Sequence, residues 1–392
     1  MNDLQGPGLF ERVLSPFPFI CGVVLSFLAC CVLGRMVSNI NCHQDFARFH
    51  NHINFLSLHY PTAKQTLAIA REHMNNGQIL VIVGGNSVLH GSYLSDQQVW
   101  TKHLQLLLGD RYCVLNFALP GMSPTEFGAL VADLICRQYE RVIFVTYSWP
   151  GATGVVGEAD GRTLRYFYWD AYHKGLIDPD AARDARIELL TKWRAKDANH
   201  RELVLRSRID SYLYCQDLWT TFSYSCRSTI WTPMTSSTFT RPRKQYQDLK
   251  VSIPAQYHYL PENEQAGMQL VRNSVSRHWT GDPAASPLAE SIRYCLPTHL
   301  RPRSLVLIAH HSPRFVHRLT ASEQQAYHAM FPETIEAVAS TGCQACELGR
   351  GYTELDYIDQ VHSSSDGAVK MAAEVTPRVQ ELARQLGYLN EE

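Results

Sequence analysis

The 392-residue chain has no excess of charge of either sign. Its 36 lysines and arginines balance 37 aspartates and glutamates, which leaves a formal net charge of −1. The sequence also has no basic block of the kind that follows a phosphate backbone. We therefore expect no nucleic-acid partner.

Cofactor-binding motifs are missing as well. Gly84 and Gly85 end an apolar run, but the lysine of a phosphate-binding loop is absent, and the two glycines do not fit the dinucleotide fingerprint GxGxxG. Cys343 and Cys346 form a single CxxC, with no second pair of ligands at the spacing of a zinc site. We expect no metal and no cofactor, and a redox or metal role for this CxxC is the least favoured alternative.

Charged residues are absent between Val13 and Gly34, where the sequence contains the apolar run PFPFICGVVLSFLACCVLG. A helix of about 20 such residues spans the roughly 30 Å of a bilayer's hydrocarbon core. The sequence therefore predicts a membrane anchor over residues 1–36. A cleaved signal peptide is the alternative, although its apolar core is usually only about 7–15 residues long. Lipidation at Cys30 is a further, less favoured alternative.

The orientation of this anchor is only weakly encoded. Arg12 precedes the apolar run, and Arg35 and Arg48 follow it, so the count of positive charges is nearly balanced. The eleven cysteines include Cys215 and Cys226, which suit either disulfides outside the cytoplasm or buried thiols. We expect a single-pass protein whose main domain is periplasmic or extracellular.

Strands and helices alternate after a connector and helix at residues 37–75. Each strand is a continuous apolar run, which is typical of a parallel sheet covered on both faces. The pattern stops in a long insertion or cap, and it returns near the C-terminus. The first half of this α/β domain is residues 76–151, the insertion is 152–300, and the second half is 301–392. Strands are predicted at 79–83, 112–117, 141–147, 304–310 and 342–348, and helices at 62–74, 95–110, 123–138, 181–196, 321–340 and 365–386.

Ser87 directly follows the first predicted strand, in the segment VIVGGNSVLHG. This position lies at the carboxyl end of the sheet, where ligand sites of open α/β folds gather. The preceding glycines let the backbone turn sharply, and a helix beginning after them directs N–H groups at negative charge. The segment predicts a nucleophile, and an ordinary turn between strand and helix is the alternative.

The base for such a nucleophile is found in Asp359-Gln360-Val361-His362, just before the last predicted helix. A serine hydroxyl is a weak nucleophile unless a base takes its proton, and the base works best when a carboxylate fixes its tautomer. We predict that His362 is the base of Ser87 and that Asp359 orients its imidazole.

These segments resemble the spaced blocks of the SGNH (GDSL-like) hydrolase family, with the serine first in the chain and Asp-x-x-His last. The resemblance covers residues 79–150 and 304–386. It implies a three-layer α/β/α, flavodoxin-like fold and a glycine N–H in the oxyanion hole, which corresponds to Gly121 in NFALPGMSPTEFG.

The sequence departs from the family pattern at two positions. Asn86 stands where the family has aspartate, and it is counted here with the oxyanion and substrate-binding residues. The family's GxND block, whose asparagine donates to the oxyanion, corresponds to Thr146-Tyr147-Ser148-Trp149, so Ser148 is the candidate donor. Membrane-anchored members that act in alginate acetylation and teichoic-acid D-alanylation also depart from the strict blocks, and this chain is similar to them in its anchor and large insertion.

Three further histidines lie near the predicted site. His310 and His311 end the fourth predicted strand, where they would border the same cleft, and a merely polar strand end is the alternative. His90 is expected to cap or pack on the helix after Ser87 rather than to act as the base.

The sequence thus predicts a membrane-tethered serine esterase or O-acyltransferase that works through an acyl-enzyme, on a cell-envelope glycan or lipid-linked substrate, with a membrane protein as a possible partner. Aromatic residues of the insertion suit sugar rings, or else form the insertion's own core; they are Trp193, Tyr212, Tyr214, Trp219 and Trp231. The alternative is a catalytically degenerate SGNH-like binding or scaffold protein in a membrane assembly.

Overall fold

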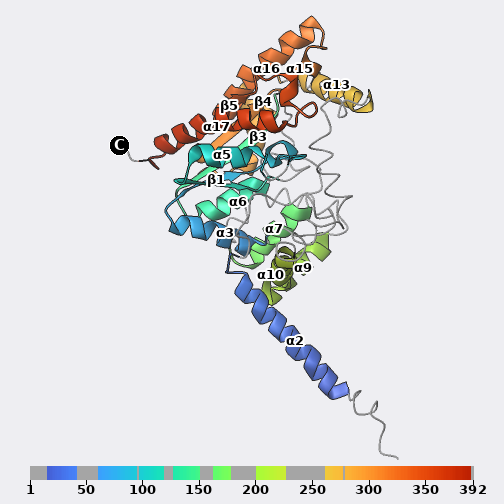
Figure 1. Ribbon diagram of the computed structural model, residues 1–392, viewed down its shortest axis with the longest axis vertical. Helices are drawn as coiled ribbons and strands as arrows, with labels where there is room; N and C mark the ends of the chain where they lie inside the picture. Colours follow the sequence, from blue (N-terminus) through green and yellow to red (C-terminus); the bar gives the residue numbers. More distant parts are fainter. Residues whose placement is uncertain are drawn as a thin grey trace, which may run out of the picture.

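The computed structural model describes residues 16–41, 61–94, 97–118, 127–150, 162–177, 200–226, 261–276 and 279–389. Within these residues the chain forms an α/β domain from which one long helix projects (Figure 1).

The centre of the domain is a five-stranded parallel sheet in the order β2-β1-β3-β4-β5. All five predicted strands are confirmed. The first four are largely apolar along their length and have no face that suits water, whereas the fifth is mixed and has Gln344 and Glu347 at half-buried positions. Every residue of β1, β3 and β4 is buried. The strands are β1 (Ile79–Val83), β2 (Tyr112–Asn116), β3 (Val142–Ser148), β4 (Ser304–Ala309) and β5 (Gln344–Leu348).

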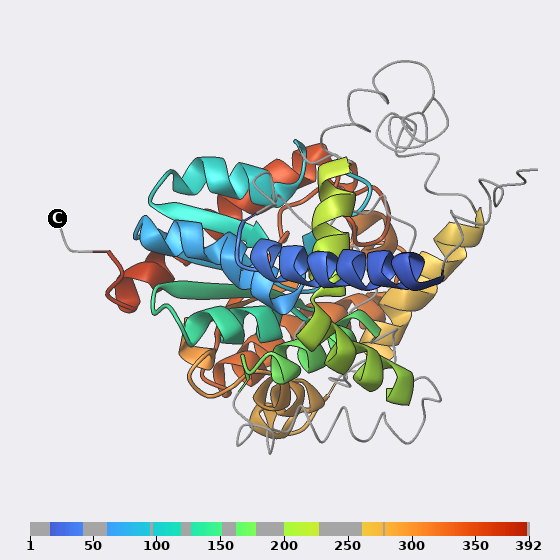
Figure 2. The same ribbon diagram turned by 90° about the horizontal axis from the view of Figure 1, so that it is seen from below.

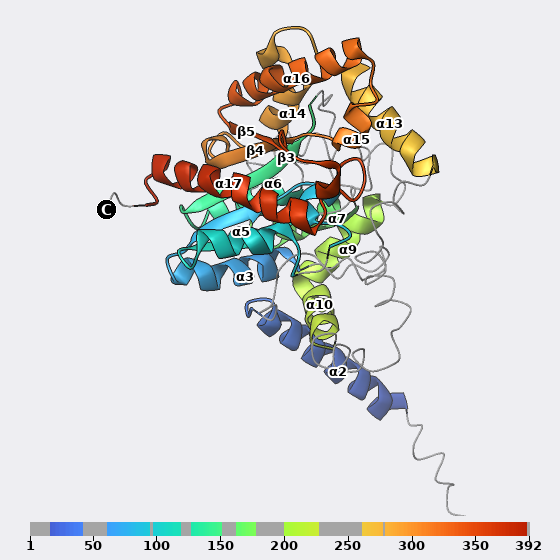
Figure 3. The same ribbon diagram turned by 45° about the horizontal axis from the view of Figure 1, so that its top comes forward.

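Helices cover both faces of the sheet (Figure 3). One face packs on α3 (Ala63–Asn75), α6 (Phe127–Cys136) and α16 (Ala321–Ala339). The other face packs on α5 (Trp100–Leu108) and α17 (Ser365–Gln385). Alternate side chains of each strand point to opposite faces, so β1 sends Leu80 and Ile82 to the first face and Val81 to the second.

Local capping sets the starts of α3 and α16. Thr62 and Gln65 form a capping box at α3, and Thr320 and Glu323 form one at α16. The predicted start of α5 at Ser95 is wrong: the helix begins at Trp100, and its N-cap is Val99. Ser95 and residues 123–126 lie outside the described residues, as does the whole predicted helix 181–196.

The insertion contributes to two separate parts of the structure. Of its first helices, α9 (His200–Leu213) and α10 (Cys215–Cys226) contact the projecting helix, and α7 (Arg162–His173) packs on α9 and α3 (Figure 1). Its last helices, α13 (Pro261–Ser276) and α14 (Pro287–Cys295), contact α16 and add to the core. The remaining short elements are α4 (Ser87–His90), α15 (Pro313–Val316) and the 3₁₀ turns Pro283–Ala285, Arg301–Arg303 and Glu354–Asp356.

The projecting helix is α2 (Pro16–Val37), and its most apolar 18-residue window has a mean hydropathy of 2.4. It is long and apolar enough to cross a membrane, and only 6% of that window is buried against the rest of the protein. An apolar helix that is exposed in this way is typical of a membrane anchor or a signal sequence rather than of a core helix.

Candidate active site

Three side chains predicted as a catalytic set lie in hydrogen-bond contact. Ser87 Oγ is 2.8 Å from His362 Nε2, and His362 Nδ1 is 2.7 Å from Asp359 Oδ2. Ser87 and His362 are separated by 275 positions in the chain. The parallel sheet brings them together, because β1 and the segment before α17 both end at its carboxyl edge.

Ser87 is placed by the turn between β1 and α4. Gly85 has φ of +125°, a conformation that residues with a side chain rarely adopt. Asn86 is the N-cap of α4, where its Oδ1 accepts from Val88 N at 3.0 Å. The amide oxygen of Asn86 is therefore engaged in capping a backbone N–H of α4. His90 is buried within the same short helix, as expected of a packing residue.

His362 is carried by a turn that Asp359 orders. Asp359 Oδ1 accepts backbone N–H groups from Val361 at 2.9 Å and from His362 at 2.8 Å. The turn is closed by a hydrogen bond from Ile358 N to His362 O at 2.8 Å. One carboxylate thus shapes the backbone with one oxygen and orients the imidazole with the other.

The electrostatics of Asp359 suit an ionised carboxylate. Burial by itself raises the pKa of this carboxyl, but the hydrogen bond and charge of His362 and the two backbone N–H donors outweigh it, so the pKa is lowered overall. An ionised Asp359 accepts a hydrogen bond from an N–H at Nδ1 of His362. The other nitrogen, Nε2, is then free to accept the hydroxyl proton of Ser87.

The site is partly open to solvent. The side chains of His362 and Asp359 are 13% and 17% exposed, so part of the pair reaches the surface. Tyr93 packs edge-on against the His362 ring, with centroids 5.1 Å apart and planes at 88°. Tyr93 was not predicted from the sequence, because nothing in a tyrosine residue indicates the positive φ of 77° that it adopts six positions after Ser87.

Gly121 and Ser148 are the other two residues predicted to bind the oxyanion, and neither is seen in contact with Ser87 or His362 among the described residues. Gly121 lies outside the described residues. Ser148 is buried at the end of β3, and its Oγ donates to Trp149 O at 3.5 Å. Alternation along β3 points Ser148 to the sheet face that packs on α6, opposite to the face that carries α17.

His310 and His311 belong to a buried cluster after β4. His310 Nε2 is 2.7 Å from Glu347 Oε1, and its ring stacks on Phe331. His311 stacks on Trp149 and contacts the hydroxyl of Tyr327 through Nδ1 at 3.2 Å. Burial, together with the neighbouring His310, lowers the pKa of His311 to about 3, so this ring is neutral at physiological pH.

The described residues contain no group of three or more His, Cys, Asp or Glu side chains that could hold a metal ion. Cys343 and Cys346 are both buried as free thiols, but they belong to clusters on opposite faces of the sheet. The two cysteines are three positions apart, an odd number, and successive side chains along extended backbone point to opposite faces of the sheet. Cys215 is a free thiol as well, and the side chain of Cys226 lies outside the described residues.

Comparison of the chain with protein-family models, with curated proteins and with solved structures gives no match.

Proposed function

We propose that this protein is a membrane-tethered, SGNH-type serine hydrolase that cleaves or transfers an ester-linked acyl group. The observation that carries the proposal is the line of contacts from Ser87 Oγ through the His362 ring to Asp359 Oδ2, at 2.8 and 2.7 Å. Two features support the SGNH assignment. The sheet order 2-1-3-4-5 is that of flavodoxin-like folds, and the serine comes first and the Asp-x-x-His last.

The reaction begins when Ser87 Oγ attacks the ester carbonyl and His362 Nε2 takes the hydroxyl proton. Asp359 stabilises the resulting imidazolium. Collapse of the tetrahedral intermediate breaks the ester C–O bond, and His362 returns the proton to the leaving alcohol. The acyl group is then bound to Ser87. An acceptor hydroxyl next attacks the acyl-enzyme with His362 as base, which regenerates Ser87.

The oxyanion needs hydrogen-bond donors that are already in place. The N–H of Ser87 is the first of α4, so it has no acceptor within that helix and is one candidate donor. Gly121 is the second candidate by its resemblance to the family block. Asn86 supports this arrangement indirectly, since its cap on Val88 N fixes the backbone that presents Ser87.

The proposed substrate is a cell-envelope glycan or a lipid-linked acyl ester. The apolar exposed helix α2 supports a location at the membrane, and we assign the domain to its periplasmic or extracellular side. Water as acceptor makes the protein an esterase, and a sugar or lipid hydroxyl makes it an O-acyltransferase. Mass spectrometry of the products with and without added acceptor separates the two reactions.

A fluorophosphonate probe tests the proposal directly, because it bonds covalently to an activated serine. We expect labelling of the full chain in detergent that is lost in Ser87→Ala. Ser92→Ala is the matched control, since Ser92 lies just after α4 and is also half-buried. A folded wild type that takes no label would overturn the proposal and favour the scaffold alternative, which the absence of the family's asparagine near Ser148 motivates.

A further inference from the structure

Helix α9 has its polar and apolar faces reversed relative to a helix on a water-facing surface. Ser207, Asp210 and Ser211 are buried. Leu205 and Ile209 are 58% and 47% exposed. Tyr212, which follows them at helical spacing on the same side, is 74% exposed. A surface helix of a soluble protein buries its apolar stripe and exposes its polar one.

Helix α10 shows the same reversal. Asp217 and Thr220 are buried, whereas Trp219 and Phe222 are 53% and 58% exposed. Five exposed apolar side chains of α9 and α10 are called the outward apolar residues: Leu205, Ile209, Tyr212, Trp219 and Phe222. Tyr212 and Trp219 therefore do not form the core of the insertion, which was one of the two expectations from the sequence. Tyr214 is half-buried, and Trp193 and Trp231 lie outside the described residues.

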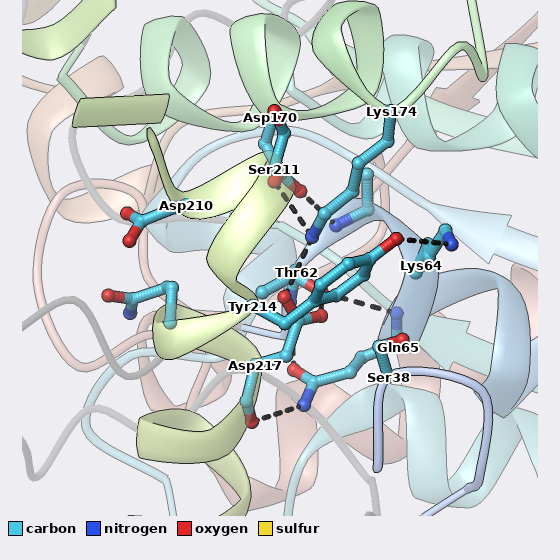
Figure 4. A network of polar contacts seen from close by, with 12 residues as sticks. Ser38, Thr62, Lys64, Gln65, Asp170, Lys174, Asp210, Ser211, Tyr214 and Asp217 are labelled. Atoms are coloured by element: carbon cyan, nitrogen blue, oxygen red, sulfur yellow. Dashed lines mark hydrogen bonds and ion pairs between the residues drawn. The ribbon is translucent and has the colours of Figure 1, made fainter. Parts of the chain in front are cut away.

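Asp217 of α10 belongs to a buried network of ion pairs and hydrogen bonds (Figure 4). Lys174 Nζ lies 2.8 Å from Asp170 Oδ1 and 2.8 Å from Asp217 Oδ2, and all three side chains are fully buried. Asp217 Oδ1 accepts from Thr62 Oγ1 at 2.5 Å, and Asp170 Oδ2 accepts from Ala63 N at 3.0 Å. This network fixes α7 and α10 to the start of α3.

Both α9 and α10 contact α2 where α2 joins the domain. A Cβ on Gly34 would lie 2.3 Å from Tyr214 O, so only glycine permits this approach. Ser38, one turn further on, is fully buried. Figure 2 shows α10 crossing α2 close to this end of the helix. The helices that carry the outward apolar residues therefore meet α2 near the end at which it enters the domain.

We infer that α9 and α10 rest on the lipid bilayer, with the outward apolar residues in the boundary between headgroups and acyl chains. This inference rests on the part of the proposed function in which α2 spans the membrane. The position of α9 and α10 indicates a bilayer as the partner. If α2 spans the membrane, its C-terminal end lies at the bilayer surface, and α9 and α10 pack beside that end. Trp and Tyr favour this boundary. The exposed Arg208 suits contact with phosphate headgroups.

The contact has a consequence for the substrate. The buried network ties α10 to α3, and α3 packs directly on the sheet. A bilayer contact through α9 and α10 would therefore hold the whole domain in one orientation relative to the membrane, instead of leaving it to swing on α2. A fixed height of Ser87 above the surface suits an acyl donor or acceptor that is itself a lipid.

Fluorescence quenching by brominated lipids tests this contact on the full chain. The purified protein is placed in phosphatidylcholine nanodiscs with or without bromine on the acyl chains. We expect brominated lipid to reduce the tryptophan emission of the wild type, and most of that reduction to disappear in Trp219→Phe. Trp279→Phe is the matched control, because Trp279 is also exposed (43%) but precedes the 3₁₀ turn that packs on α16, away from α2.

The outcomes separate this inference from the proposed anchoring. A chain that does not float with liposomes overturns the membrane anchor and the interfacial contact together. A chain that floats, yet shows the same quenching in Trp219→Phe as in the wild type, overturns the interfacial contact alone. In that case the outward apolar residues face a protein partner or solvent.

Discussion

Asp359 holds His362 at both its ring and its backbone, using a different oxygen for each. Oδ2 lies 2.7 Å from Nδ1, and Oδ1 accepts the main-chain N–H at 2.8 Å. The residue that orients the imidazole therefore also builds the turn that carries it. Because the two roles use separate atoms, substitutions at this one position distinguish them.

Asp359→Asn should lower kcat while leaving the fold intact. An asparagine whose oxygen occupies the Oδ1 position still accepts the backbone N–H groups of Val361 and His362, but its amide N–H₂ faces Nδ1 and favours the wrong tautomer. We expect a loss of roughly 10³- to 10⁴-fold in ester hydrolysis. Asp359→Ala should lose the same activity and, in addition, lower the midpoint of thermal unfolding. Equal midpoints for the two variants would contradict the structural role of Oδ1.

Asn86→Asp should keep most of the activity, because aspartate at an N-cap accepts the Val88 N–H as asparagine does. Asn86→Ala should lose the cap, at a cost of about 1 kcal/mol in local stability, and should reduce labelling of Ser87. The rate of fluorophosphonate labelling measures both effects. If the alanine variant labels at the wild-type rate, the cap does not position Ser87.

The buried His311 predicts a loss of stability in acid. Its pKa is lowered from 6.5 to about 3 in the native state, so between these values the unfolded chain binds a proton that the native chain does not. The free energy of unfolding therefore falls as pH falls from 6.5 towards 3, by up to about 1.4 kcal/mol per pH unit from this residue.

Chemical denaturation of the full chain in detergent between pH 7 and pH 4 measures this slope. We expect His311→Asn to flatten it, and His317→Asn, which removes an exposed histidine, to serve as the control. An unchanged slope in His311→Asn would mean that other groups cause the acid sensitivity.

Gly34→Ala should weaken the contact between α2 and α10. The added Cβ meets Tyr214 O at 2.3 Å, closer than any Cβ contact, so the helix must shift. Gly22→Ala is the matched control on the same helix, because its Cβ would meet nothing within 4 Å. We expect faster amide hydrogen exchange in α10 for Gly34→Ala in nanodiscs and no change for Gly22→Ala. Identical exchange in both variants would show that this contact does not hold α10.

The sequence by itself determined the features that depend on neighbouring residues. Largely apolar runs predicted four of the five strands, and helical spacing predicted a helix over 62–74 that the structure has at Ala63–Asn75, because these signals act within a few positions. The proposed pairing of Ser87 with His362 also came from the sequence, through the order of the family-like segments. Their contact at 2.8 Å did not, since it depends on how two distant turns meet at one edge of the sheet.

Only the tertiary structure decided the features that depend on packing between distant segments. Helix α5 begins at Trp100, whose indole is fully buried and donates from Nε1 to Leu89 O, a contact between separate segments that the local pattern does not indicate. The reversed faces of α9 and α10 could not be predicted from the sequence either. Helical spacing separates polar from apolar residues, but it does not determine which side of the helix faces inward. On α10, the buried ion pair of Lys174 with Asp217 holds the polar side inward. On α9, Ser207 contacts His173, and Ser207 and Ser211 donate to the helix's own backbone, so their hydroxyls are satisfied without water.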